Sequence, residues 1–345
     1  MTKSTQRTTP QRPDRRLTIG LLADRLGERY QSGVLDGILK AAEKRDVNLI
    51  CISGRALRLP YGFEAQCNVL YDLVGVETVD GLLVMGGSLC HFISPEEIRY
   101  LYHERYHPLP VVSIALEVEG VPSVLVDNVR GIRDLVGHLI EAHGYHRIAF
   151  IRGPEGSPEA ELRYHAYCDA LAEHGLPLDP DLVAPGDFNP PSGREAVSLF
   201  LDQRKVDLEA IVAANDSMAL GALEALQARR IDVPGTVALV GFDDVEAATS
   251  STPPLTTVRQ PLHAMGRQAV ELLLARLAGE EVSEHVMLPT DLVVRRSCGC
   301  ISQTVIEAGM TETARVKKPF TAAFSARSQQ ILSAMAQAVE PLPGS

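Results

Sequence analysis

The chain has 345 residues, of which 45% are hydrophobic and 22% charged, and its formal net charge at pH 7 is −11. That length exceeds what one hydrophobic core usually serves, so we expect two compact lobes. The acidic balance argues against a broad surface for nucleic acid or an anionic membrane. The sequence has neither an apolar run of about 18 residues nor a secretory signal core, and its six cysteines are scattered. We therefore expect a cytoplasmic protein without membrane spans.

Short apolar runs alternate with stretches of helical periodicity from Leu17 onward. The first series predicts strands at 17–23, 47–53, 80–86, 109–115 and 122–127, and helices at 31–45, 64–75, 95–107 and 131–144. The second series predicts strands at 146–153, 181–188, 210–216 and 236–242, and helices at 158–174, 192–204 and 217–229. Continuous apolar strands that alternate with helices indicate parallel sheets covered on both faces. We predict an α/β fold of two doubly wound parallel-sheet lobes.

Two motifs resemble metal-binding sites, but neither is expected to form a complete one. HERYH, residues 103–107, matches the H-E-x-x-H pattern, but Pro108 disfavours helix at His107, so we expect a solvated helix end rather than a zinc site. Cys298 and Cys300 form a C-x-C pair, which would supply half a metal site or respond to oxidation. A zinc site takes about four ligands, so a structural or incidental role is favoured. We predict no metal site.

The sequence also lacks the main signatures of nucleotide binding and hydrolysis. Neither 86–88 nor 153–159 has the spacing of a Walker loop or of G-x-G-x-x-G, and no G-x-S-x-G elbow occurs. We expect neither an enzyme nor a cofactor.

Polar and aromatic residues gather where the predicted strands end, and in open α/β sheets ligands bind beyond those carboxyl ends. The candidate ligand-binding residues are Tyr30, Gln31, Arg163, Phe188, Asn215 and Asp243. One guanidinium, amides, a carboxylate and two aromatic rings suit a hydroxyl-rich or heterocyclic ligand. Asp216 is instead expected to cap the helix that follows it, and Asp244 is expected to be a cap or a support beside Asp243.

Residues 17–297 resemble the effector-binding core of the LacI/GalR family, which has the type I periplasmic-binding-protein fold. The resemblance is carried by VPSVLVDN, AIVAANDSMALGALEAL and VPGTVALVGFDDVEAATSSTPPLTTVRQP. It implies two lobes joined by three crossovers, with a sugar-like or purine-like effector between them. The six candidate residues fall at the family's effector-contacting positions, except that Gln31 replaces an aromatic residue.

The resemblance also suggests domain boundaries. We expect an N-terminal lobe at 17–144 plus 259–283 and a C-terminal lobe at 145–258 plus 284–300. Residues 1–16 are expected to be a disordered arm, and 301–345 a tail with one helix at 320–339.

The family's repressors begin with a DNA-binding helix-turn-helix and hinge of roughly 60 residues, and only 16 residues precede the first strand here. The RRSCGC end most resembles sensor regions that precede histidine-kinase or diguanylate-cyclase modules. We expect a homodimeric small-molecule sensor that signals by lobe closure to a fused or separate output module, without direct DNA binding. The alternatives are a regulator that binds DNA through a missing segment or a partner, and a periplasmic-type solute-binding protein.

Overall fold

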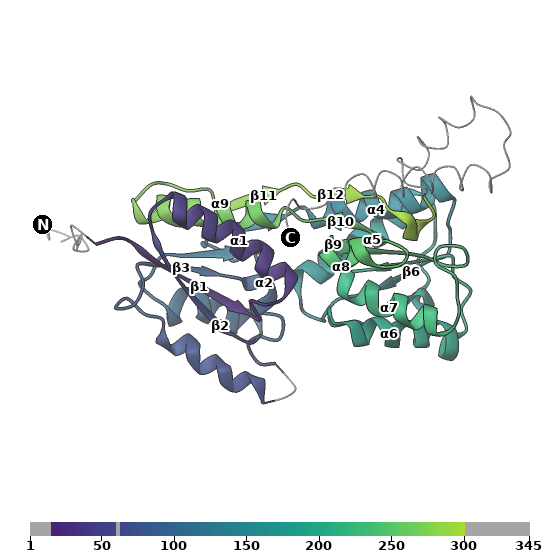
Figure 1. Cartoon of the computed structure of the whole chain (residues 1–345), viewed down its shortest axis with the longest axis horizontal. Coiled ribbons are helices and arrows are strands. Elements are labelled where there is room, and N and C mark those ends of the chain that lie inside the picture. The colour runs from purple at the N-terminus through teal and green to yellow at the C-terminus, as the bar shows by residue number, and fades with distance from the viewer. Residues whose placement is uncertain (1–14, 60–62, 301–345) are drawn as a thin grey trace, which may run out of the picture. The chain divides into compact units, whose positions relative to one another are not determined.

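Two six-stranded sheets organise the computed structural model, which describes residues 15–59 and 63–300 (Figure 1). The first sheet has the strand order β11-β5-β4-β3-β1-β2, and all of its strand pairs are parallel. Its strands are β1 (Thr18–Asp24), β2 (Asn48–Gly54), β3 (Gly81–Val84), β4 (Val111–Ile114), β5 (Ser123–Val126) and β11 (His285–Leu288). All but two residues of the expected arm, and all of the expected tail, lie outside the described residues.

The second sheet has the order β12-β10-β9-β8-β6-β7. It is parallel except for β12, which pairs antiparallel with β10. Its strands are β6 (Ile148–Ile151), β7 (Val183–Ala184), β8 (Ala210–Ala213), β9 (Ala238–Asp243), β10 (Thr256–Arg259) and β12 (Asp291–Val293). Every residue of β1, β3, β4, β6, β8 and β9 is buried, as expected when helices cover both faces of a sheet. The predicted fold class is confirmed.

The α-helices are α1 (Arg29–Lys44), α2 (Gly86–Leu89), α3 (Pro95–Tyr100), α4 (Asn128–His143), α5 (Pro158–Glu173), α6 (Pro190–Ser198), α7 (Asp216–Ala228), α8 (Glu246–Ser250) and α9 (Leu262–Leu277). Short 3-10 or π segments are η1 (Glu64–Leu73), η2 (Leu101–Arg105), η3 (Pro180–Leu182), η4 (Leu199–Arg204) and η5 (Arg296–Cys298). Gly144 ends α4 in the left-handed conformation at φ 69°, which glycine adopts without a steric penalty. No helix among the described residues is long and apolar enough to cross a membrane.

The chain passes between the two sheets three times, as expected. It crosses at Asp127 after β5, at Gln260 and Pro261 after β10, and at residues 289–290 between β11 and β12. Two of the crossings are tied together, because Thr290 Oγ1 donates to the Asp127 carbonyl oxygen at 3.1 Å. Asp127 also caps α4 by accepting from the backbone N–H of Arg130.

Two of the expected lobe boundaries are wrong. Helix α4, assigned above to the N-terminal lobe, buries Ile132, Leu135 and Leu139 in the core of the second sheet. Strand β11, assigned to the C-terminal lobe, pairs with β5 of the first sheet. An amphipathic helix or an edge strand fits either lobe by its sequence alone, and only tertiary packing decides which one it joins.

Candidate functional site

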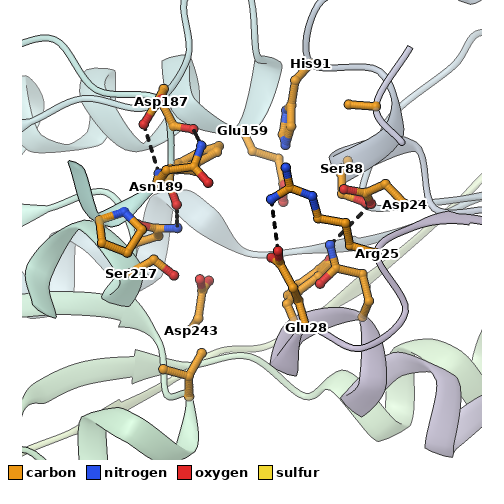
Figure 2. Close-up of a pocket in the computed structure, with 18 of the residues that line it drawn as sticks. Asp24, Arg25, Glu28, Ser88, His91, Glu159, Asp187, Asn189, Ser217 and Asp243 are labelled. Carbon is orange, nitrogen blue, oxygen red and sulfur yellow. Dashed lines mark hydrogen bonds and ion pairs between the residues drawn. The ribbon is translucent and has the colours of Figure 1, made fainter. Parts of the chain in front are cut away.

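A cavity of about 600 Å³ receives side chains from both lobes and from the crossover at Gln260. All six predicted ligand-binding residues line it, and Figure 2 shows carboxylates approaching it from several elements. Its volume is within the range of small-molecule sites, about 300–1,000 Å³. The structure thus brings the predicted set together, while its role in binding stays a prediction.

Arg163 is the fixed cation of this cavity. It projects from α5, is 3% exposed, and donates from Nε to Asn128 Oδ1 at 2.8 Å and from Nη1 to the Ala214 carbonyl oxygen at 2.7 Å. Its guanidinium lies 3.9 Å from the ring centroid of Phe242. Because these contacts hold the plane of the guanidinium, Arg163 presents a charge of fixed position to the cavity.

Asp243 ends β9 in a backbone conformation that L-residues rarely adopt, with φ 121°. Its Oδ1 accepts from Gln260 Nε2 at 2.6 Å and lies 3.8 Å from Arg163 Nη1. Burial raises the pKa of Asp243 to about 6, although Arg163 and Gln260 oppose the shift. Backbone strain and a desolvated carboxyl are both costly, and such costs concentrate at functional sites.

The capping roles expected for the two neighbouring aspartates are wrong, and of the two roles expected for Asp244 only that of a support remains. Asp244 caps no helix but forms ion pairs with Arg259 and Arg295 at 2.7 and 2.6 Å. Asp216 is the first residue of α7 rather than its cap, and its carboxylate accepts from Thr257 Oγ1 and the Val245 N–H.

The cap of α7 is Asn215, which was expected to reach the ligand. Its Oδ1 accepts from the Met218 N–H at 2.9 Å, and its Nδ2 donates to the Phe188 carbonyl oxygen at 3.0 Å. Asn215 lines the cavity, but these bonds engage both ends of its amide. It therefore positions the Phe188 backbone as well as the start of the helix.

Phe188 supplies the aromatic face on the second lobe. Its backbone is left-handed at φ 65°, and its ring lies 5.4 Å from the ring of His91, which comes from the first lobe. Burial lowers the pKa of His91 to about 4, so this ring is neutral at pH 7. The two rings form one wall of the cavity.

The first lobe contributes a hydrogen-bonded group around Asp24, the last residue of β1. Its Oδ1 accepts from Gln31 Nε2 at 3.2 Å and from Ser88 Oγ. Tyr30, next to Gln31 on α1, is half-buried, but its hydroxyl is buried, and this burial together with nearby carboxylates raises the pKa of the hydroxyl well above 10. Tyr30 is therefore a neutral donor at pH 7.

Three buried polar atoms of the cavity lining have no hydrogen-bond partner within the described part of the chain. They are Tyr30 Oη, Gln31 Oε1 and Gln260 Oε1. Buried polar groups in folded proteins are nearly always hydrogen-bonded, and leaving one unpaired costs about 1–3 kcal/mol. One hydroxyl and two amide oxygens of lining residues thus lack partners in the ligand-free fold.

Sequence reasoning missed several lining residues, among them Asp24, Ser88, His91, Glu159 and Gln260. Asp24 could have been predicted from its position, because it directly follows the predicted strand 17–23 and ligands bind beyond the carboxyl ends of such strands. Gln260 lies in a crossover, and Glu159 precedes Arg163 by one helical turn, so neither carries the strand-end signal.

The H-E-x-x-H motif does not form the geometry that a metalloprotease needs. The π-helical segment η2 ends at Arg105, and His107 lies beyond it, before a cis peptide bond to Pro108. The two histidines are therefore not presented from consecutive turns of one helix, in accordance with the prediction.

A family model described as a periplasmic binding protein-like domain matches residues 136–298. The chain is 34% identical over 275 residues to the HTH-type transcriptional regulator CelR of Thermobifida fusca, an alignment that covers 78% of this chain and 76% of CelR. It is 35% identical over 234 residues to the HTH-type transcriptional repressor CytR of Escherichia coli strain K12, covering 67% of this chain and 66% of CytR.

Solved structures agree with these relatives. The complex of the transcriptional regulator CelR with cellobiose superposes with a TM-score of 0.70 at 33% identity, covering 83% of this chain and 86% of that one. The Escherichia coli repressor ascG gives a TM-score of 0.65 at 30% identity, covering 81% and 98%.

Proposed function

The chain belongs to the LacI/GalR family of ligand-sensing transcriptional regulators, and from this premise we propose that it senses an uncharged, hydroxyl-rich molecule, a mono- or disaccharide, in the cavity between its lobes. The observation that carries the proposal is the set of unpaired buried atoms, Tyr30 Oη, Gln31 Oε1 and Gln260 Oε1. A sugar hydroxyl both donates and accepts, so one ligand satisfies all three.

The charge of the cavity favours a neutral ligand over a phosphorylated one. Its described lining carries two arginines, Arg25 and Arg163, against a larger number of acidic residues. These acidic residues are Asp24, Glu28, Glu159, Asp187, Glu224 and Asp243. Arg25 pairs with Glu28, and Arg163 lies near Glu159 and Asp243. Because acidic residues still outnumber the two arginines, an anionic group entering the cavity meets a net negative charge.

The aromatic wall supports the same ligand class. Phe188 and His91 offer apolar ring faces, against which the C–H faces of a pyranose pack, while carboxylates and amides bind its hydroxyls. A relative of similar structure was solved in complex with cellobiose, a disaccharide, and a cavity of about 600 Å³ accommodates a ligand of that size. A purine-like effector remains the alternative that the aromatic wall also suits.

Signalling follows from the position of the cavity. Both lobes contribute side chains to it: the first lobe gives Tyr30, Gln31 and His91, and the second gives Arg163, Phe188 and Asp243. A ligand that binds side chains of both lobes therefore favours a closed arrangement of the lobes. Gln260, at a crossover, donates to Asp243 and links the cavity to a hinge. We expect a regulator rather than an enzyme, as its relatives are, with its output through a DNA-binding or signalling module of its own or of a partner.

The test is a thermal-shift screen of neutral mono- and disaccharides, the same sugars carrying phosphate, and purine nucleosides. A ligand that binds only the folded state raises the melting temperature by mass action. We expect stabilisation by a neutral sugar, followed by calorimetry on the wild type, Phe188→Ala and the control His103→Ala. Phe188→Ala should weaken binding, and His103→Ala should bind as the wild type does. Stabilisation by the phosphorylated sugars alone, or by nucleosides alone, would overturn the neutral-sugar proposal.

A further inference from the structure

Four side chains of zinc-ligating type converge at one end of the second lobe, away from the cavity. His138 and His143 project from the last two turns of α4, and Cys298 and Cys300 flank Gly299 after β12. One nitrogen or sulfur atom of each residue lies within 4.8 Å of those of the other three. Cys298 is fully buried and the other three are half-buried.

Three of the separations between these atoms match those of a tetrahedral metal site. His138 Nε2 lies 3.5 Å from Cys298 Sγ and 3.6 Å from Cys300 Sγ, and His143 Nε2 lies 3.4 Å from Cys300 Sγ. Zinc binds sulfur at about 2.3 Å and nitrogen at about 2.0–2.1 Å, which at tetrahedral angles places a sulfur and a nitrogen about 3.6 Å apart. The three separations are therefore those that a shared ion requires.

The surrounding contacts orient the ligands. Thr256 Oγ1 donates to Cys298 Sγ at 3.2 Å and is itself held by the N–H of Arg295. The ring of His143 stacks on that of Tyr145 with centroids 5.3 Å apart, and the Tyr145 hydroxyl donates to the Cys298 carbonyl oxygen at 3.3 Å. Ligands of structural metal sites are commonly fixed by partners of this kind.

The local backbone brings the two cysteines to the same point. The 3-10 turn η5 ends at Cys298, and Gly299 follows in the left-handed region at φ 106°. A Cβ at this position would lie 3.2 Å from His143 Cε1 as well as being strained. The glycine between the cysteines therefore both reverses the chain and leaves room for the histidine ring.

We propose that His138, His143, Cys298 and Cys300 bind one Zn²⁺ ion in a structural Cys₂His₂ site. Two thiolates and two neutral imidazoles balance the charge of a divalent ion. Four protein ligands leave no open position for a substrate, so the site is structural rather than catalytic. This proposal differs from the prediction of no metal site, which was made from the sequence. That prediction considered only the C-x-C pair, because the two histidines are distant from it along the chain.

The site would join segments more than 150 residues apart, the C-terminal end of α4 and the segment after β12. A link across so long a loop restricts the unfolded chain strongly and thereby stabilises the fold. It would also fix the position of Cys300, from which the chain continues into residues 301–345. The proposal is independent of the ligand in the cavity.

The experiment measures zinc in the full chain after purification under reducing conditions. We expect elemental mass spectrometry to find one equivalent of zinc per chain. A chelator should lower the melting temperature, and added Zn²⁺ should restore it. Co²⁺ in place of Zn²⁺ should give the intense visible bands of a tetrahedral ion and a thiolate charge-transfer band. Cys300→Ser and His143→Ala should lose the metal and the cobalt spectrum.

Matched control variants are Cys168→Ser and His165→Ala on α5, which change the same residue types outside the cluster. Both should keep one equivalent. Circular dichroism establishes that the variants fold, and Cys300 and His143 are chosen because they are only half-buried. A metal content near zero in the reduced wild type, unchanged metal in both ligand variants, or a Cys298–Cys300 disulfide that persists in reductant would each overturn the site.

Discussion

At the scale of single residues, several residues that line the cavity reduce the stability of the ligand-free protein. Asp243 combines a strained φ of 121° with burial that raises its pKa from 3.8 to about 6. Tyr30 and Gln260 leave buried polar atoms unpaired. Each feature costs stability in the ligand-free protein, and we expect a polar ligand to offset the cost of the unpaired atoms by supplying their partners.

The first prediction is that Asp243→Asn stabilises the free protein. A carboxyl whose pKa is raised on folding stabilises the fold at pH below about 4, and this contribution is lost as the pH rises through about 6. At pH 7 the wild type therefore carries the full penalty, which the neutral amide removes while still accepting from Gln260. We expect a gain of about 1–3 kcal/mol, measured by urea denaturation at pH 7 and absent at pH 3.5. An equal gain at both pH values would show that the ionisation of Asp243 is not its cause.

The second prediction concerns binding by the same variant. An ionised acceptor for ligand hydroxyls contributes about 1.5–3 kcal/mol, so Asp243→Asn should weaken sugar binding roughly 10–100-fold at pH 7. Calorimetry with the sugar found in the screen measures this, and His103→Ala serves as the unaffected control. Undiminished affinity in Asp243→Asn would place the ligand away from this carboxyl.

The third prediction is a pH dependence of affinity. Because the pKa of Asp243 is about 6 in the free protein, lowering the pH from 7.5 to 5 protonates it and removes the ionised acceptor. Wild-type affinity should fall across this window, and Asp243→Asn should show a flatter profile. Fluorescence or calorimetric titrations at several pH values compare the two, and parallel profiles would assign the pH dependence to another group.

At the scale of elements, each lobe contains a pair of helices whose backbones touch at glycines. In the first lobe, a Cβ at Gly37 of α1 would collide with the His263 carbonyl oxygen of α9, and one at Gly266 with that of Val34. In the second lobe, a Cβ at Gly221 of α7 would collide with the Pro190 carbonyl oxygen of α6. These contacts set the distance between the helices that cover each sheet.

The fourth prediction is that Gly221→Ala destabilises the protein. Overpacking against a backbone atom typically costs about 1–3 kcal/mol, because the helices must separate. Gly75→Ala is the control, since nothing lies within 4 Å of a Cβ at that position. Urea midpoints measure the difference. Equal midpoints for the two variants would show that α6 and α7 move apart at little cost.

At the scale of the whole molecule, apolar side chains remain exposed on β2 and η1, two elements that pack together at the edge of the first sheet. Ile50, Val69 and Leu73 are 43%, 65% and 64% exposed. Exposed apolar residues that gather on neighbouring elements are typical of protein–protein contacts. This observation supports the expected homodimer.

The fifth prediction is that a charge on this surface yields a monomer. Val69→Asp and Leu73→Asp should convert a dimeric wild type to a monomer in light scattering at micromolar concentration. Leu162→Asp, on an exposed position of α5, should leave the dimer intact. A monomeric wild type, or dimers in all three variants, would contradict the proposal.

The sequence by itself determined the order and type of most elements, because continuous apolar strands that alternate with helices admit few folds. The predicted strands 17–23 and 236–242 end one residue before β1 and β9 do. Strand ends also led to six residues that line one cavity, since parallel strands of a lobe deliver their carboxyl ends to the same edge.

Only the tertiary structure decided what depends on contacts between distant segments. The sheet that β11 joins, the bond from Asn215 to the Phe188 carbonyl oxygen and the unpaired oxygen of Gln260 follow from packing that no local pattern records. The meeting of His138 and His143 with the C-x-C pair is the clearest case. Their side chains lie together because α4 packs on the second sheet and β12 returns beside it, although more than 150 residues separate them along the chain.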